Sequence, residues 1–341
     1  MKLENYLLKI TLPDIGRKRN EHIYLHGVDS SFKEIYLEIK PKIKHGEFTK
    51  FIYSLLDSPK GTIDSWILGN NPIPILKFHK LLNLWKKMCG ISDSIFNKKW
   101  DQIFKKTRYF SAWNSPKVIL PKELNEEISY LCGFIIGDGH IKDEFKLKKR
   151  TGNAEYSISL YSNSKEFIKK LKILVFKNFN LISKTYFSKD KKGSWYTLRF
   201  TCKPIYRFFT ECLRIHSGNR TGNAKVPEIV KEGSIEIKKS FISGFFDAEA
   251  GVGITNKGPW LEIGQLSYTN QSEILKWIKK TLNDYSIELN GPYPMSIRNM
   301  WKLRTASKKT INRFYKTISS RHPEKVQIYQ KIGEFRYENR T

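Results

Sequence analysis

Cysteine is scarce in this chain of 341 residues, and it follows no pattern. The four cysteines, Cys89, Cys132, Cys202 and Cys212, are scattered without a close Cys-x-x-Cys pair. This scatter excludes a zinc site of the paired-cysteine kind and a disulfide framework, and it is typical of free thiols in a reducing compartment. The seven histidines also lack any spacing that would indicate a general base.

Long apolar runs are missing as well. No stretch is apolar for long enough to span a membrane, no amphipathic anchor stands out, and the first residues lack the pattern of a signal peptide. We therefore expect a cytoplasmic protein that does not bind membranes, with an organellar location as the alternative.

Acidic residues are few relative to basic ones. The chain has 61 Lys and Arg against 33 Asp and Glu, which gives a net charge of +28. A surface that served only for solubility would mix both signs, so the excess indicates a polyanionic partner, most simply nucleic acid. The hydrophobic fraction of 40% and the aromatic fraction of 13% are sufficient for folded cores.

Two short stretches resemble each other, and each contains an acid near its end. Residues 129–139 read SYLCGFIIGDG, and residues 240–250 read SFISGFFDAEA. Small residues four positions apart share one face of a helix and allow a second helix to approach closely. We therefore expect two packed helices whose terminal acids meet. The aligned pairs are Gly133 with Gly244, Gly137 with Ala248, and Asp138 with Glu249.

The two acids need a cationic partner in this arrangement. Asp138 and Glu249 would stand at helix C-termini, where partial negative charge disfavours a carboxylate, and they would also repel each other. A hard divalent cation removes both penalties. Because Mg²⁺ is usually held by one or two carboxylates with waters and substrate phosphates, the pattern indicates a Mg²⁺ site that a phosphodiester completes.

The paired stretches resemble the two motifs of LAGLIDADG homing endonucleases, in the single-chain form of the archaeal or intron type. Residues 131–139 fit the nine-residue pattern with Asp138 at the catalytic acid, and residues 242–250 fit it again with Glu249 there. Ala250 replaces the usual final glycine, which is a mild departure. Two matches in one very basic chain are far more specific than one would be.

The resemblance covers about residues 121–331 and implies an α+β fold. We expect two pseudo-symmetric αββαββα repeats that form a DNA-binding saddle, preceded by a mostly helical N-terminal domain. The expected division is an N-terminal domain at 1–113, a linker at 114–121, a first repeat at 122–222 and a second repeat at 223–341.

The resemblance also implies an activity and a metal site. We expect a sequence-specific double-strand DNA endonuclease in which metal-activated water cleaves both strands of a long, asymmetric site. Asp138 and Glu249 would bind Mg²⁺ together with backbone carbonyls near Gly137 and Ala248, and Mn²⁺ or Ca²⁺ could replace it for binding. Since one chain carries both motifs, we expect a monomer.

Strand patterns follow each motif. Residues 155–161 and 195–200 alternate between apolar and polar, and residues 260–263 and 300–305 repeat the pattern. A sheet with one polar, basic face suits the DNA major groove, although contact with phosphate or solvent is as good an explanation for any one side chain. The expected DNA-binding residues are Ser157, Ser159, Tyr161, Thr197, Arg199, Lys302 and Arg304.

Members of the family often carry a basic residue near the metals. The positions that we match to it, Asn163 and Asn270, are not lysine in this sequence. Lys165, and Lys203 after the second strand pair of the first repeat, are further candidates for a supporting role.

The N-terminal part shows two short extended patterns at residues 6–12 and 22–26, followed by short helical patterns. Short helices joined by tight turns are typical of a helix-turn-helix unit. Thr62 is a suitable helix N-cap, and the sequence from it to Pro74 resembles the recognition-helix region of phage-repressor-like domains. An all-helical packing domain is the alternative. The residues expected near DNA are Lys60, Thr62, Asp64 and Ser65, with Ile63, Trp66 and Ile67 in the core.

Two other functions fit the same fold. An intron RNA maturase would use the basic saddle to hold structured RNA, and a non-cleaving regulator would only bind DNA. The presence of both acids argues against the regulator, whereas the sequence leaves DNA and RNA as open alternatives.

Overall fold

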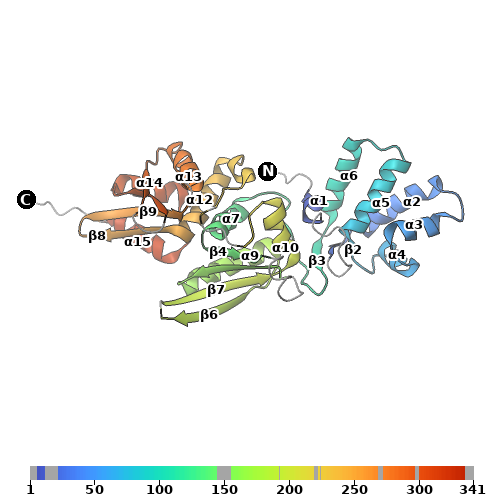
Figure 1. Ribbon diagram of the computed structural model, residues 1–341, viewed down its shortest axis with the longest axis horizontal. Coiled ribbons are helices and arrows are strands. Elements are labelled where there is room, and N and C mark those ends of the chain that lie inside the picture. The colour runs from blue at the N-terminus through green and yellow to red at the C-terminus, as the bar shows by residue number, and fades with distance from the viewer. Residues whose placement is uncertain are drawn as a thin grey trace, which may run out of the picture.

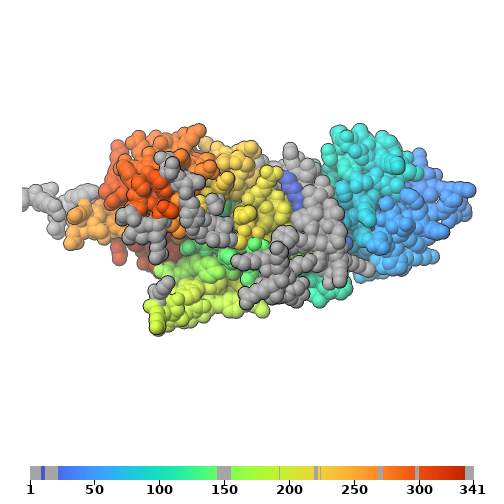
Figure 2. Space-filling view, viewed as in Figure 1, coloured from blue at the N-terminus to red at the C-terminus, as the bar shows by residue number. Residues whose placement is uncertain are grey.

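The protein is described by a computed structural model that covers residues 6–11, 22–143, 155–191, 193–218, 222, 224–267, 272–295 and 299–334. A mostly helical N-terminal domain lies at one end of an elongated molecule, and the two repeats lie at the other (Figure 1, Figure 2). The described residues form three antiparallel sheets, one in each of these parts. No helix among them is long and apolar enough to cross a membrane.

The N-terminal domain packs its helices against a small sheet with the strand order β2-β1-β3. Residues 6–11 form a helix, so the extended pattern predicted there is wrong. Such a short apolar run does not distinguish a helix from a strand, and here it packs against η4 and α5. The elements are α1 (Tyr6–Thr11), β1 (Ile23–His26), α2 (Asp29–Ile39), η3 (Lys40–Lys42), α3 (Phe48–Leu56), α4 (Lys60–Ile67), β2 (Ile73–Pro74), α5 (Ile75–Met88), α6 (Asp93–Lys106) and β3 (Tyr109–Ala112).

The segment that the sequence indicated as a linker is packed. Val118 forms a β-bridge with Phe110 of β3, and the Ile119 amide donates to the Phe179 carbonyl at 3.0 Å. Val118 and Leu120 are buried. The segment therefore fastens the N-terminal domain to the first repeat.

The two repeats have the same architecture. In each, a motif helix leads directly into a four-stranded antiparallel sheet, with the orders β4-β5-β7-β6 and β8-β9-β11-β10. This arrangement confirms the predicted α+β fold. The first repeat contains α7 (Glu126–Asp138), β4 (Gly139–Ile141), β5 (Ser157–Ser162), α9 (Lys165–Phe179), β6 (Lys184–Asp190), β7 (Gly193–Thr201), α10 (Lys203–Arg207) and the π-helix η4 (Phe208–Cys212). The second contains α11 (Glu228–Lys231), α12 (Ile235–Glu249), β8 (Ala250–Thr255), β9 (Gly258–Leu266), α13 (Glu273–Asn283), β10 (Asn290–Pro294), β11 (Met300–Thr305), α14 (Lys308–Ile318) and α15 (Pro323–Glu334).

Both motif helices begin at a side-chain cap. The Asn125 side chain accepts a hydrogen bond from the Ile128 amide at 2.8 Å, and the Ser234 side chain accepts one from the Ile237 amide at 3.4 Å. Such caps satisfy amide groups that the first helical turn leaves unpaired. The caps thus fix where each motif helix starts and where its final acid lies.

The backbones of α7 and α12 touch each other. A Cβ atom at Gly133 would lie 2.1 Å from the carbonyl oxygen of Phe241, and one at Gly244 would lie 2.0 Å from that of Tyr130. Ser129 adds a hydrogen bond across the pair, from its hydroxyl to the carbonyl of Ile237 at 2.7 Å. The small residues four positions apart therefore have the packing role that the sequence indicated.

We expect Gly244→Ala to destabilise the protein by about 1–3 kcal/mol, because the new methyl group must push the two helices apart. Chemical denaturation measures this change. Gly333→Ala is the matched control, since a Cβ at that position of α15 meets nothing within 4 Å. An equal stability of the two variants would contradict the close packing.

Candidate functional site

The two predicted acids come together at the C-terminal ends of the motif helices. Asp138 is the last residue of α7, and Glu249 is the last residue of α12. A Cβ at Gly137 would lie 2.5 Å from the Ala248 Cβ and 2.9 Å from the Glu249 Cγ. The missing side chain of Gly137 therefore leaves the space in which the acid of the other repeat lies.

A cavity of about 380 Å³ opens at this point, and both repeats line it. Asp138 and Asn163 contribute from the first repeat, and Ala248 and Lys325 from the second. Asn270, the other position matched to a family lysine, lies outside the described residues. Lys203 is buried against the Tyr156 ring, 5.0 Å from its centroid, and does not line this cavity.

The environment of the two acids opposes their negative charge. Burial raises the pKa of Asp138, and the positive charge of Lys325 partly offsets this shift. Burial, and then repulsion from Asp138, raise the pKa of Glu249 to about 7. The helix C-termini add partial negative charge beside the two acids, and Lys325 compensates only part of it.

The donor set fits a hard divalent cation. It consists of two carboxylates, and the carbonyls near Gly137 and Ala248 that the resemblance implies would add further oxygen ligands. Over the part of the chain that the structure describes, no group of three or more His, Cys, Asp or Glu could hold a metal ion. Mg²⁺ held by one or two carboxylates usually takes its remaining ligands from water and substrate phosphates.

Lys325 of α15 is a site residue that the sequence analysis missed. Its Nζ donates to the carbonyls of Phe246 and Asp247, at 2.6 and 3.0 Å, and so satisfies the end of α12. Burial lowers the pKa of Lys325 to about 8, although the neighbouring acids, Asp247 first, oppose this shift. The helical spacing was an available signal. Lys325 lies on the same face of α15 as Tyr329 and Ile332, whose side chains are buried, so the spacing indicates that Lys325 also points inward.

Asp247 fixes the end of α12 from the other side. This buried carboxylate accepts hydrogen bonds from the Tyr130 hydroxyl at 2.6 Å, the Arg321 amide at 2.8 Å and the Ser320 hydroxyl at 2.5 Å. Both of its oxygens are engaged. Asp247 therefore joins α12 to α7 and to the segment before α15, and it lies beside the acid pair without belonging to it.

Five of the predicted contact residues lie on the outer faces of the two sheets, away from the buried strand residues. In the first sheet Tyr161 opposes Thr197, and in the second Lys302 and Arg304 lie on β11. Ser159 opposes Arg199 and Glu262 opposes Arg304, so the two arginines hold equivalent positions. The register thus confirms the correspondence that the sequence pattern indicated.

Ser157 and Ser159 differ from expectation. Both lie on the polar side of β5 but are buried, with exposed fractions of 2% and 9%. Their side chains are short, and Glu155 forms ion pairs with both Lys142 and Arg199 next to them. Their place on the polar side of β5 agrees with the sequence pattern, and their contact with DNA stays a prediction, although both short side chains are buried in the protein alone.

The outer faces carry further residues that the sequence analysis did not select. Lys184 and Tyr186 of β6 lie opposite Arg199 and Thr197 and are exposed. On the second sheet, a Cβ at Gly251 or Gly253 would meet the Trp260 ring within 3 Å. The two glycines therefore leave room for this ring on the face. The alternation in β6 was the signal for Lys184 and Tyr186.

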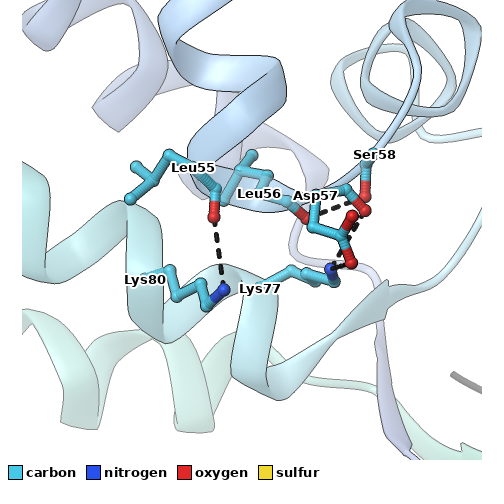
Figure 3. A network of polar contacts seen from close by, with 6 residues as sticks. All are labelled: Leu55, Leu56, Asp57, Ser58, Lys77 and Lys80. Atoms are coloured by element: carbon cyan, nitrogen blue, oxygen red, sulfur yellow. Dashed lines mark hydrogen bonds and ion pairs between the residues drawn. The ribbon is translucent and has the colours of Figure 1, made fainter. Parts of the chain in front are cut away.

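In the N-terminal domain, α3 and α4 are joined by a tight turn that α5 stabilises (Figure 3). Lys77 donates to the Asp57 carbonyl at 3.1 Å and pairs with its carboxylate at 3.3 Å, and Lys80 donates to the Leu55 carbonyl at 3.3 Å. Ser58 donates to the Leu56 carbonyl at 3.0 Å. Cations at a helix C-terminus are favourable, so the two lysines stabilise the end of α3 and the turn that follows it.

The faces of α4 largely follow the prediction. Ile63 and Trp66 are buried, with the Trp66 ring 5.8 Å from that of Phe32, whereas Ile67 is only half-buried. Lys60 is exposed, and the other predicted contact residues, Thr62, Asp64 and Ser65, are half-buried. The helix begins at Lys60 after Pro59, so Thr62 is not its N-cap.

Comparison with known proteins agrees with this geometry. Residues 125–212 match the family described as LAGLIDADG-like domain. The homing endonuclease I-ApeI of Aeropyrum pernix is 27% identical over 175 residues, which cover 49% of this chain and 73% of that protein. The glutamine–fructose-6-phosphate aminotransferase of Methanocaldococcus jannaschii is 26% identical over 186 residues, which cover 50% of this chain and only 14% of that protein.

Solved structures are similar as well. I-DmoI in complex with DNA and Ca is 21% identical with a TM-score of 0.43, over 60% of this chain and 97% of that chain. Full-length DUF199/WhiA from Thermatoga maritima is 20% identical with a TM-score of 0.41, over 65% of each chain. The family match over residues 125–212, the similarity to I-ApeI and the two converging motif helices confirm the predicted resemblance to LAGLIDADG homing endonucleases.

Proposed function

We propose that this protein is a sequence-specific DNA endonuclease that hydrolyses one phosphodiester bond in each strand of a duplex. One observation carries the proposal. The two motif helices bring Asp138 and Glu249 together at their C-terminal ends, between two sheets with polar, basic outer faces. The net charge of +28 and the similarity to the homing endonuclease I-ApeI support the same assignment.

Asp138 and Glu249 would hold Mg²⁺, with the main-chain carbonyls near Gly137 and Ala248 as further ligands. When bound there, the metal activates water and stabilises the leaving oxygen of the phosphodiester. Lys325 adds a positive charge beside the acids, where negative charge develops on the phosphate. Its hydrogen bonds to the end of α12, and those of Asp247, keep Glu249 in place.

The outer faces of the two sheets would read one half-site each. Equivalent positions carry different side chains: Thr197 corresponds to Lys302, and Ser159 corresponds to Glu262. Since the two faces differ, the two half-sites should differ too, which gives an asymmetric target. Both acids come from one chain, so we propose that the protein acts as a monomer.

The N-terminal domain would add a second contact with DNA. α3 and α4 are short helices joined by a tight turn, which supports the helix-turn-helix prediction, and Lys60 at the start of α4 is exposed. A backbone-positioning contact of this kind raises affinity without reading bases.

Cleavage of a plasmid library with random inserts in the presence of Mg²⁺ tests the proposal. We expect discrete cuts by the wild type and a loss of more than about 100-fold in Asp138→Asn and Glu249→Gln, because even residues that only support a metal ligand are often worth 10–100-fold. Asp284→Asn and Glu273→Gln, which remove the same charges at α13, are the matched controls. Tight, salt-sensitive DNA binding without any cutting would contradict the endonuclease and favour the maturase or regulator.

Lys325→Met should reduce the cleavage rate by about 10–100-fold while DNA affinity in Ca²⁺ changes little, because the lysine acts at the reaction centre. Single-turnover rates and binding titrations separate the two effects. Lys325→Arg keeps the charge and should retain part of the activity. A Lys325→Met protein that is stable and cleaves at the wild-type rate would contradict this role.

The raised pKa of Glu249 makes stability depend on pH. Between its ordinary value of 4.5 and the folded value of about 7, the folded state keeps a proton that the unfolded state has released. The stability of the metal-free protein should therefore fall as pH rises through this window, and Ca²⁺ should stabilise it more at about pH 8 than at about pH 6. Thermal unfolding with chelator and with Ca²⁺ measures both effects. Glu249→Gln should lose this part of the pH dependence, and an unchanged dependence would contradict the assignment.

A further inference from the structure

Each sheet carries an acid that pairs with two basic side chains on the outer face. In the second sheet, Glu262 Oε2 lies 2.8 Å from Lys302 Nζ, and its Oε1 lies 3.7 Å from Arg304 Nε. In the first sheet, Glu155 pairs with both Lys142 and Arg199. A face that only attracted phosphates would gain nothing from a carboxylate, since each negative charge weakens phosphate binding.

The two acids do not occupy equivalent positions. Glu262 lies within β9 and opposes Arg304, whereas the residue that opposes Arg199 in the first sheet is Ser159. Glu155 lies just before β5 and reaches the same arginine position from there. The same ion-pair arrangement is thus built from different positions in the two repeats, so it is not simply a remnant of duplication.

The two arginines remain partly accessible while they are paired. Arg304 is 56% exposed, whereas Glu262 beside it is 23% exposed. A guanidinium that is paired with a carboxylate on one side still has free N–H donors on the other. Two of these can bond to O6 and N7 of guanine, and this contact discriminates guanine from the other bases. An arginine that is already ordered also loses less conformational entropy on binding.

We propose that Glu155 and Glu262 are positioning residues for base recognition. Each glutamate orients the arginine beside it toward a base edge. Each also cancels part of the local positive charge, which weakens binding to the phosphate backbone of any sequence. This inference rests on the proposed DNA-binding function. The proposed role is in recognition and not in folding, because partly exposed ion pairs contribute little to the free energy of unfolding.

Selection of bound duplexes from a random pool, carried out in Ca²⁺, tests the inference. We expect Glu262→Gln to relax base preference by about 10-fold at one or two adjacent base pairs of one half-site. Glu155→Gln should do the same in the other half-site. Both variants should bind non-specific DNA more tightly, with a salt dependence steeper by about one counterion. Glu273→Gln removes a charge from α13, which packs on the opposite side of the second sheet, and should match the wild type.

Three results would overturn the inference. If the wild type selects a site and both variants select it with the same preference, the acids do not position the readout, while the endonuclease proposal stands. If the wild type selects no sequence, the proposed function fails and this inference fails with it. A large loss of thermal stability in both variants would show that the ion pairs are structural instead.

Discussion

The rest of the structure depends on the close approach of α7 and α12. Carbonyl oxygens of one helix occupy the space that a Cβ would need on Gly133 or Gly244 of the other. Because the helices meet backbone to backbone, the positions of their last residues are fixed relative to each other. Each sheet starts directly after a motif helix, at β4 and at β8, so the same contact also sets where the two outer faces lie. One packing contact therefore determines both the acid pair and the surfaces beside it.

The acid pair is built in an unfavourable electrostatic environment. Burial raises the pKa of both carboxyls, and two helix C-termini add negative charge. The positive charge of Lys325 offsets only part of this negative charge. Lys325 is itself buried, and it donates hydrogen bonds to the carbonyls at the end of α12. A site that is destabilised in this way by its own charges gains most from a bound cation, which links metal binding to stability.

The sequence predicted those features that depend on local spacing. The paired motifs, the helical glycines and the strand alternation each follow from residues close together in the chain, and the structure contains them. Lys325 could not be assigned in this way, because it reaches the site from a helix 76 residues after Glu249. The burial of Ser157 and Ser159 was missed for a similar reason, since the neighbouring ion pairs of Glu155, with Lys142 after β4 and with Arg199 of β7, join residues far apart in the chain. Residues 6–11 form a helix because of their contacts with η4 and α5, which the short run itself does not reveal.

The central claim is that Asp138 and Glu249 form a single cation site on which a duplex is cut. Anomalous diffraction at the manganese edge, from crystals of the protein with its selected duplex and Mn²⁺, tests it most directly. The account predicts anomalous density within coordination distance of both carboxylates and next to the phosphates of the two strands. A bound duplex with Mn²⁺ elsewhere, or with the two acids too far apart to share one site, would contradict it.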